Sequence, residues 1–159
     1  CPEDALGEDA VVFKYVRSYL GNIELLRENT RYTIKDIAFC TSVRHIHPVE
    51  TYGLLFNLNK KIALITDTRY FEELSDSYHA DILIINVLRL KPIEKQEPIE
   101  HLAVNDFVDI ITRIRPEVAV MTHFGMALIK EKPYVLAEKL KKETGIEIIA
   151  AHDGMKMEF

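Results

Sequence analysis

Three short, almost uninterrupted apolar runs constrain the fold of this chain most. They are ADILIINVL at 80–88, EVAVMT at 117–122 and IEIIAA at 146–151. Runs of this length without polar alternation are typical of strands that are covered on both faces. Because helical patterns separate the runs, this part of the chain predicts strand–helix–strand units of a layered α/β domain with a mixed sheet.

The helices between these runs have clear boundaries. The clearest is VNDFVDIITRI at 104–114, which Pro116 ends. A second helix is expected to begin at Pro133 and to end at Gly145, a C-terminal cap. RYFEELSDSY at 69–78 predicts a short helix. The apolar positions of the first helix recur at helical spacing: Val104, Phe107, Val108, Ile111 and Ile114.

Antiparallel strands are expected upstream. YGLLFNL at 52–58 and KIALIT at 61–66 flank a polar turn and predict a β-hairpin. Residues 22–43 predict two or three short strands with a turn at Glu28-Asn29. VVFKYVRSYL at 11–20 is rich in β-formers and favours a strand, with a helix as the alternative.

The two ends of the chain and one internal segment complete the expected layout. Residues 1–10 and 89–100 are polar or charged and predict loops. MKMEF at 155–159 predicts a last strand.

Composition narrows the function classes. The chain has 159 residues, of which 48% are apolar and 28% charged, and this composition suits one globular domain. Because the net charge is −5, a basic surface for nucleic acid is not expected, although nucleic acid is not excluded as a partner. No run reaches the roughly 18–20 apolar residues of a membrane span, and no signal peptide is visible. Cys1 and Cys40 lack CxxC spacing and fit a reducing cytoplasm. No GxGxxG or GxxxxGK loop occurs, which argues against nucleotide binding.

Four polar residues stand directly after apolar strands. They are His47, Asp67, His123 and Asp153. Ligands in layered α/β folds collect at strand ends, and imidazoles with a carboxylate suit zinc, iron or manganese. Ordinary structural roles are alternatives: Asp67 as a helix cap, His47 as a surface histidine, and Asp153 with Gly154 as a turn.

Six stretches in order carry a family resemblance. HPVETYGLLF, ALITDTRYF, ADILIIN, EHLAVNDF, AVMTHFGM and AAHDGM resemble the C-terminal half of metallo-β-lactamase-fold hydrolases, nearest to the phosphodiesterase-like and ribonuclease Z-like branches. The similarity covers about residues 30–159. It implies half of an αββα sandwich, whose dinuclear metal site lies between the two halves at one edge of the sheets.

The resemblance also implies roles for individual residues. His47 resembles a ligand of the first metal, Asp67 the carboxylate that bridges both metals, and His123 a ligand of the second. His45 matches less well and is expected to be a neighbour of the site. His101 resembles a histidine near the scissile phosphate, which donates a proton to the leaving oxygen or stabilises developing charge.

The implied chemistry is hydrolysis of an ester-type bond, a phosphodiester first, by water activated at two divalent ions. Zinc is the first expectation, with iron or manganese as alternatives. Asp67 and His101 are the candidate catalytic residues, and the alternative for His101 is a cap on the helix near Val104. The expected partner is a small-molecule or phosphodiester substrate, in the cytoplasm and without a membrane.

One family motif, His-x-His-x-Asp-His, is missing. The single His-x-His, at 45–47, is followed by Pro-Val-Glu. We therefore expect residues 1–159 to be one half-domain, a fragment that lacks the N-terminal half of the fold. The alternative is a natural half-domain that acts as a binding or structural module or is complemented by a partner chain. Either form would expose an apolar sheet face, which predicts a homo-oligomer or association with the missing half.

Overall fold

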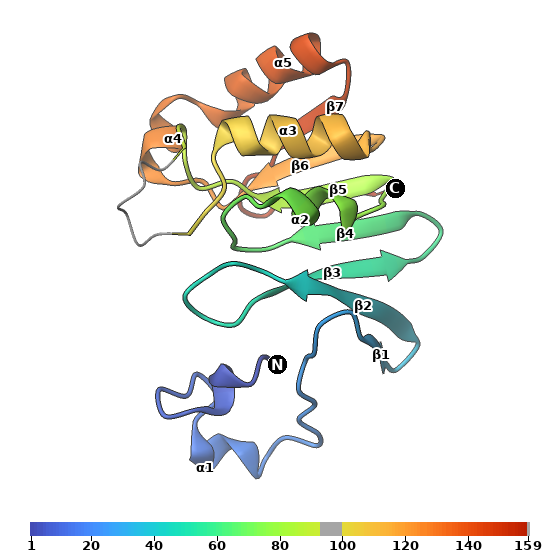
Figure 1. Cartoon of the computed structure of the whole chain (residues 1–159), viewed down its shortest axis with the longest axis vertical. Helices are drawn as coiled ribbons and strands as arrows, with labels where there is room; N and C mark the ends of the chain where they lie inside the picture. The colour runs from blue at the N-terminus through green and yellow to red at the C-terminus, as the bar shows by residue number, and fades with distance from the viewer. Residues whose placement is uncertain (93–99, 159) are drawn as a thin grey trace.

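A seven-stranded mixed sheet organises the chain, and its strands lie in sequence order from β1 to β7 (Figure 1). The computed structural model describes residues 1–92 and 100–158. Strands β1 to β4 pair antiparallel, whereas β4 to β7 pair parallel. The strands are Arg31–Ile34 (β1), Ile37–Arg44 (β2), Tyr52–Asn57 (β3), Lys61–Ile65 (β4), Ile82–Asn86 (β5), Val118–Thr122 (β6) and Glu147–Ala150 (β7).

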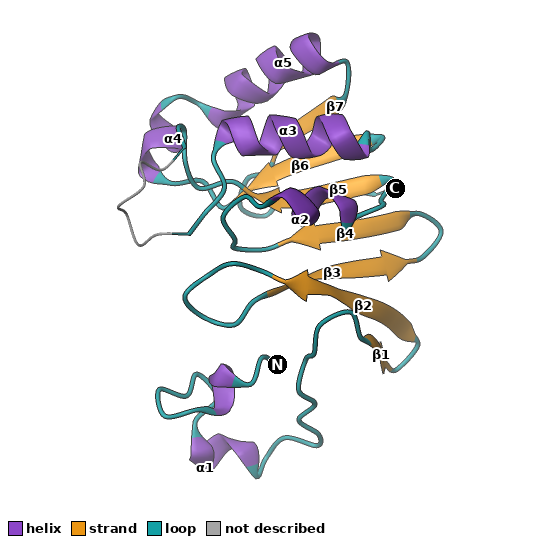
Figure 2. Ribbon diagram, in the orientation of Figure 1, coloured by secondary structure: helices purple, strands orange, loops and turns teal. Residues whose placement is uncertain are grey.

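Three helices cover the parallel part of the sheet. Figure 2 shows α2, α3 and α5 lying over the strands β4 to β7. The described helices are Lys14–Arg17 (α1), Glu72–Asp76 (α2), Val104–Ile114 (α3), Met126–Lys130 (α4) and Pro133–Thr144 (α5), with a single 3₁₀ turn at Asp4–Leu6. None of the described helices is long and apolar enough to cross a bilayer.

The core lies between these helices and one face of the sheet. Ile65, Leu83 and Met121 point from adjacent parallel strands into this layer, and each is fully buried. Phe107 and Leu140 meet them from α3 and α5. The alternation of strand side chains between two faces therefore sends every second apolar residue toward the helices.

Most of the expected elements are confirmed. The mixed sheet, the hairpin of β3 and β4, and helix α3 lie where their patterns predict. Pro133 begins α5, and Gly145 caps it with φ of 72°, a left-handed conformation that glycine adopts without a steric penalty. Helix α4 has no counterpart among the predicted elements. The loop predicted at 89–100 lies partly outside the described residues.

Two strand predictions are wrong. Residues 11–20 hold α1 and turns, and Val11, Tyr15 and Tyr19 are exposed. β-forming side chains stabilise a strand through packing against neighbours, and no strand pairs with this segment in the described chain. Residues 155–158 form no strand either, and Phe159 lies outside the description.

The second face of the sheet is less covered than the first. Ile84 in β5 is only partly buried, so the expectation of complete cover on both faces fails at that position. Other partly exposed apolar side chains accompany it on neighbouring strands: Ile62, Leu64 and Ile149. Association of this face with another layer stays a prediction.

Candidate metal centre

Loops at one edge of the sheet bring four chemically active side chains together. His47 follows β2, Asp67 follows β4 and His123 follows β6, while His101 precedes α3. Two antiparallel steps separate β2 from β4, and parallel steps join β4 to β6. These three strands therefore run in the same direction, and their carboxyl ends meet at the edge where their arrowheads lie in Figure 1.

Asp67 lies at the centre of the group. Its Oδ1 is 3.5 Å from His101 Nδ1 and 3.5 Å from His123 Nε2. Ligand atoms of His47, Asp67 and His101 all lie within 4.8 Å of one another. The His101 ring centroid is 5.2 Å from that of His47 and 5.5 Å from that of His123. The compact trio thus contains His101, and His123 joins it through Asp67.

The structural alternatives for two of these residues do not hold. Asp67 does not cap α2, whose N-cap is Phe71. His101 does not cap α3, since the N-cap is Ala103, which donates its N–H to the Asp106 carboxylate at 2.8 Å. Both side chains instead face the shared cluster. Their roles as ligand or catalyst stay predictions.

Asn86 is a member of the site that the sequence patterns did not single out. It ends β5, and its Nδ2 donates a hydrogen bond of 2.8 Å to Asp67 Oδ1. This contact holds one carboxylate oxygen in a defined orientation toward the histidines. The available signal was its place as a polar residue at the end of an apolar run, on the edge where the other strand ends meet.

His123 has an unusual backbone. Its φ of 62° is left-handed, which is uncommon for residues other than glycine and clusters at functional sites. The next turn is held tightly: Gly125 donates its N–H to the Leu88 carbonyl at 3.0 Å, and a Cβ there would lie 2.5 Å from that oxygen. The loops after β5 and β6 therefore fix where the imidazole points.

Asp153 differs from the other three strand-end residues. It is exposed, and Met155 donates its N–H to the His152 carbonyl at 3.0 Å around it, as in an ordinary turn. Its carboxylate is not part of the metal-competent group found among the described residues. With His123 and His152 it lines a cavity of about 320 Å³ beside the cluster.

Burial lowers the pKa of two histidines in this region, His101 and His45. It lowers the pKa of His101, an effect that the nearby Asp67 carboxylate opposes. Burial also lowers the pKa of His45 to about 4, opposed by the backbone of Asp67. Neutral imidazole is the form that ligates metals, so burial favours the binding-competent form of His101. His45 is turned away from this role, because its Nε2 is 2.7 Å from the hydroxyl of Tyr78.

The donor set fits a divalent transition metal. Neutral imidazoles with one carboxylate are suitable ligands for zinc, iron or manganese. His47, Asp67 and His123 are the residues expected to hold such ions. His101 lies beside them, and Asn86 orients the carboxylate.

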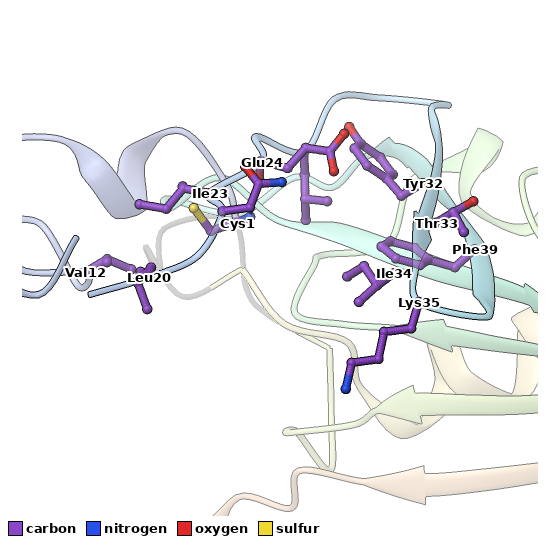
Figure 3. Close-up of a pocket in the computed structure, with 12 residues that line it drawn as sticks. Cys1, Val12, Leu20, Ile23, Glu24, Tyr32, Thr33, Ile34, Lys35 and Phe39 are labelled. Atoms are coloured by element: carbon purple, nitrogen blue, oxygen red, sulfur yellow. The ribbon is translucent and has the colours of Figure 1, made fainter. Parts of the chain in front are cut away.

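A larger cavity elsewhere is separate from this cluster. It measures about 500 Å³ and lies between the N-terminal segment and β1–β2 (Figure 3). Leu20, Ile23, Tyr32 and Phe39 give it an apolar wall, and none of the four clustered residues lines it.

Comparisons with known proteins agree with this arrangement. The model of the family described as "Beta-lactamase superfamily domain" matches residues 1–124. An uncharacterized protein of Methanocaldococcus jannaschii, MJ1374, is 31% identical over 164 residues, which cover 98% of this chain and 58% of that protein. The chain therefore spans little more than half the length of the curated relative that it matches.

Several solved structures have a similar fold, and the matches again cover most of this chain but a smaller part of each solved chain. One described as a new diphosphatase from the PhnP family is 25% identical with a TM-score of 0.64, and the match covers 94% of this chain and 55% of that one. Igni18, a metallo hydrolase from Ignicoccus hospitalis, is 15% identical with a TM-score of 0.66, over 91% of this chain and 66% of that one. YhfI of Bacillus subtilis, a metallo-β-lactamase-fold protein, is 16% identical with a TM-score of 0.65, over 83% of this chain and 54% of that one.

The family match, the mixed sheet and the histidine–aspartate cluster at its edge lead to one conclusion. The chain belongs to the Beta-lactamase superfamily domain family and has the metallo-β-lactamase fold.

Proposed function

We propose that this chain is the C-terminal, ligand-bearing half of a metal-dependent hydrolase that cleaves ester-type bonds, with a phosphodiester or diphosphate as substrate. The convergence of His47, Asp67, His101 and His123 on one edge of the sheet carries the proposal. Three histidines from separate loops lie around the one Asp67 carboxylate, and this donor set is suited to binding divalent metal ions.

The similarity to a PhnP-family diphosphatase supports the substrate class. That structure matches nearly the whole chain, 94%, at 25% identity. A substrate with a phosphorus–oxygen bond also suits the cluster, because phosphoryl transfer depends mainly on positioning and charge stabilisation.

Each residue of the cluster has a separate proposed role. Bound divalent ions would stabilise negative charge that develops on the substrate and lower the pKa of water. Asp67 supplies the negative charge that offsets the ions, and Asn86 holds that carboxylate through its 2.8 Å hydrogen bond. His101 is partly buried beside Asp67 and can donate a hydrogen bond or a proton to the leaving oxygen. The cavity of about 320 Å³ beside His123 offers room for part of the substrate.

We further propose that an upstream half with the His-x-His-x-Asp-His motif supplies the remaining ligands. A catalytic zinc usually has about three protein ligands, whereas His47, Asp67 and His123 would give only two to each of two ions if Asp67 bridges them. The coding sequence upstream of Cys1 tests this directly. If no such motif is encoded there, the binding-module alternative gains support, with the cluster acting as a weaker metal site.

The main experiment uses the full-length protein and its Asp67→Asn variant. We expect the wild type to bind zinc or manganese in elemental analysis and to hydrolyse bis(p-nitrophenyl) phosphate, and Asp67→Asn to lose both properties. Asp109→Asn, at an exposed carboxylate on α3, is the matched control and should retain them. Full metal content and activity in Asp67→Asn would refute the proposed site.

A further inference from the structure

A buried polar network lies directly behind the metal-competent cluster. His45 is 3% exposed and Tyr78 is 0% exposed. His45 Nε2 is 2.7 Å from the Tyr78 hydroxyl, and its Nδ1 is 3.1 Å from the Thr66 hydroxyl. His45 and Thr66 thus join the chain just before His47 to the chain just before Asp67.

The partners determine which nitrogen of His45 carries the proton. Thr66 donates its hydroxyl hydrogen to the Tyr52 carbonyl at 3.0 Å, so its oxygen is left to accept from His45 Nδ1–H. A neutral ring with hydrogen on Nδ1 has an acceptor at Nε2. The Tyr78 hydroxyl therefore donates to Nε2. The chain of donors is complete, which a buried polar group requires.

An irregularity in β2 lies directly before His45 in the chain. Thr41 pairs with Leu54 and Arg44 with Tyr52, so the register between β2 and β3 shifts by one residue. Such a bulge turns the following side chains to the other face of the sheet. Ser42, at the bulge, accepts a 2.9 Å hydrogen bond from the backbone of Gly53.

Gly53 is required beside this network. A Cβ at this position would lie 1.8 Å from the Tyr78 hydroxyl oxygen. The absence of a side chain at this position of β3 therefore leaves room for the Tyr78 hydroxyl beside His45.

Backbone and side-chain hydrogen bonds tie the same two loops together beyond the network. Ile46 donates its N–H to the Thr68 hydroxyl at 3.1 Å, and Arg69 donates its N–H to the Ile46 carbonyl at 3.0 Å. Thr51 donates its hydroxyl hydrogen to the Asp67 carbonyl at 3.1 Å. Hydrogen bonds therefore join the loops that carry His47 and Asp67 both before and after these two residues.

We propose that His45 is a positioning residue: as a neutral imidazole protonated on Nδ1, it couples Tyr78 to Thr66 and holds the His47 and Asp67 loops at metal-ligating distance. The inference rests on the proposed function, because the distance between the His47 and Asp67 side chains is important only if the two residues bind a metal together. It assigns His45 no contact with metal or substrate.

Tyr78→Phe tests the role with the smallest change, because it removes one hydroxyl and keeps the buried ring. Cobalt(II), added to the full-length protein, is the probe, and its visible absorption reports the affinity and the ligand geometry of the site. We expect Tyr78→Phe to weaken cobalt binding by about 10-fold or more, the lower end of what outer hydrogen-bond partners of metal sites contribute. The matched control is Tyr32→Phe. Tyr32 is also buried and its hydroxyl donates to the Leu25 carbonyl, but it pairs with Phe39 near the start of β2, whereas His45 and His47 follow the other end of that strand.

Two further variants separate positioning from general stability. Thr66→Val removes the partner of the other ring nitrogen and should weaken cobalt binding similarly. His45→Gln, whose amide oxygen can accept from the Tyr78 hydroxyl, should recover part of the affinity that His45→Ala loses. Thermal melting of every variant checks that binding is measured on folded protein.

Nitrogen NMR of the wild type provides a test that needs no metal. We expect long-range proton–nitrogen spectra to show His45 protonated on Nδ1 and bare on Nε2. The opposite tautomer would overturn the network. Cobalt affinity in Tyr78→Phe and Thr66→Val equal to that of Tyr32→Phe would overturn the positioning role, while binding by the wild type would leave the proposed function standing. A wild type that binds no cobalt would instead refute the proposed metal site.

Discussion

Gly53→Ala should destabilise the chain strongly, although it adds one methyl group. That methyl would lie 1.8 Å from the Tyr78 hydroxyl oxygen and 2.7 Å from the Leu64 carbonyl oxygen, well inside contact distance. Tyr78 is 0% exposed and cannot swing into solvent. Overpacking costs about 1–3 kcal/mol, and leaving the buried His45 without its 2.7 Å partner costs about 1–3 kcal/mol more.

The sum, about 2–6 kcal/mol, is a large part of the roughly 5–15 kcal/mol that stabilises a typical domain. Urea denaturation followed by circular dichroism measures the change as a lower midpoint at similar slope. Gly21→Ala is the matched control, because nothing lies within 4 Å of its added Cβ and its φ is not positive. We expect that control to change stability by about 0.5 kcal/mol or less. Equal midpoints for the two variants would refute the packing argument at Gly53.

Three further predictions follow from named contacts. Asn86→Ala removes the 2.8 Å hydrogen bond to Asp67 and should weaken zinc binding by about 10–100-fold in calorimetry. The control Asn105→Ala, at an exposed position, should leave zinc binding unchanged, and equal affinities of the two variants would contradict the orienting role of Asn86. His123→Asn should keep the melting temperature, because asparagine tolerates the φ of 62°, yet lose metal affinity, while His123→Val should also lower stability by about 1–2 kcal/mol in urea denaturation. Phe107→Ala, at a fully buried position of α3, should cost about 3–5 kcal/mol in the same assay, and a loss below about 1 kcal/mol would show that this helix does not form the core.

The elements that sequence patterns predicted well are those with strong local periodicity. Helix α3 repeats its apolar residues at helical spacing, and the strand runs of β5 and β6 are almost purely apolar. Burial of such segments is favourable in almost any compact arrangement, so their type can be read without knowing their neighbours. Residues 11–20 show the limit: β-formers there remain exposed because no strand pairs with them in the described chain.

The candidate site was only partly visible in the sequence. His47, Asp67 and His123 stand at strand ends and match the motifs, and the structure brings them near one another. The position of His101 inside the compact trio and the hydrogen bond from Asn86 depend on loops that meet across the sheet. No spacing along the chain encodes such distances, because these residues belong to different loops.

The main strands and helices from β3 to β7, the candidate ligands and the family resemblance were determined by the sequence alone, since periodicity and short motifs are local properties. Helix α4 was not. Only the tertiary structure decided the direction of each functional side chain. The one-residue bulge in β2, the bare space at Gly53 and the left-handed backbone of His123 set those directions. Each depends on atoms from another strand or loop, and residues distant in sequence acquire such contacts only when the chain is folded.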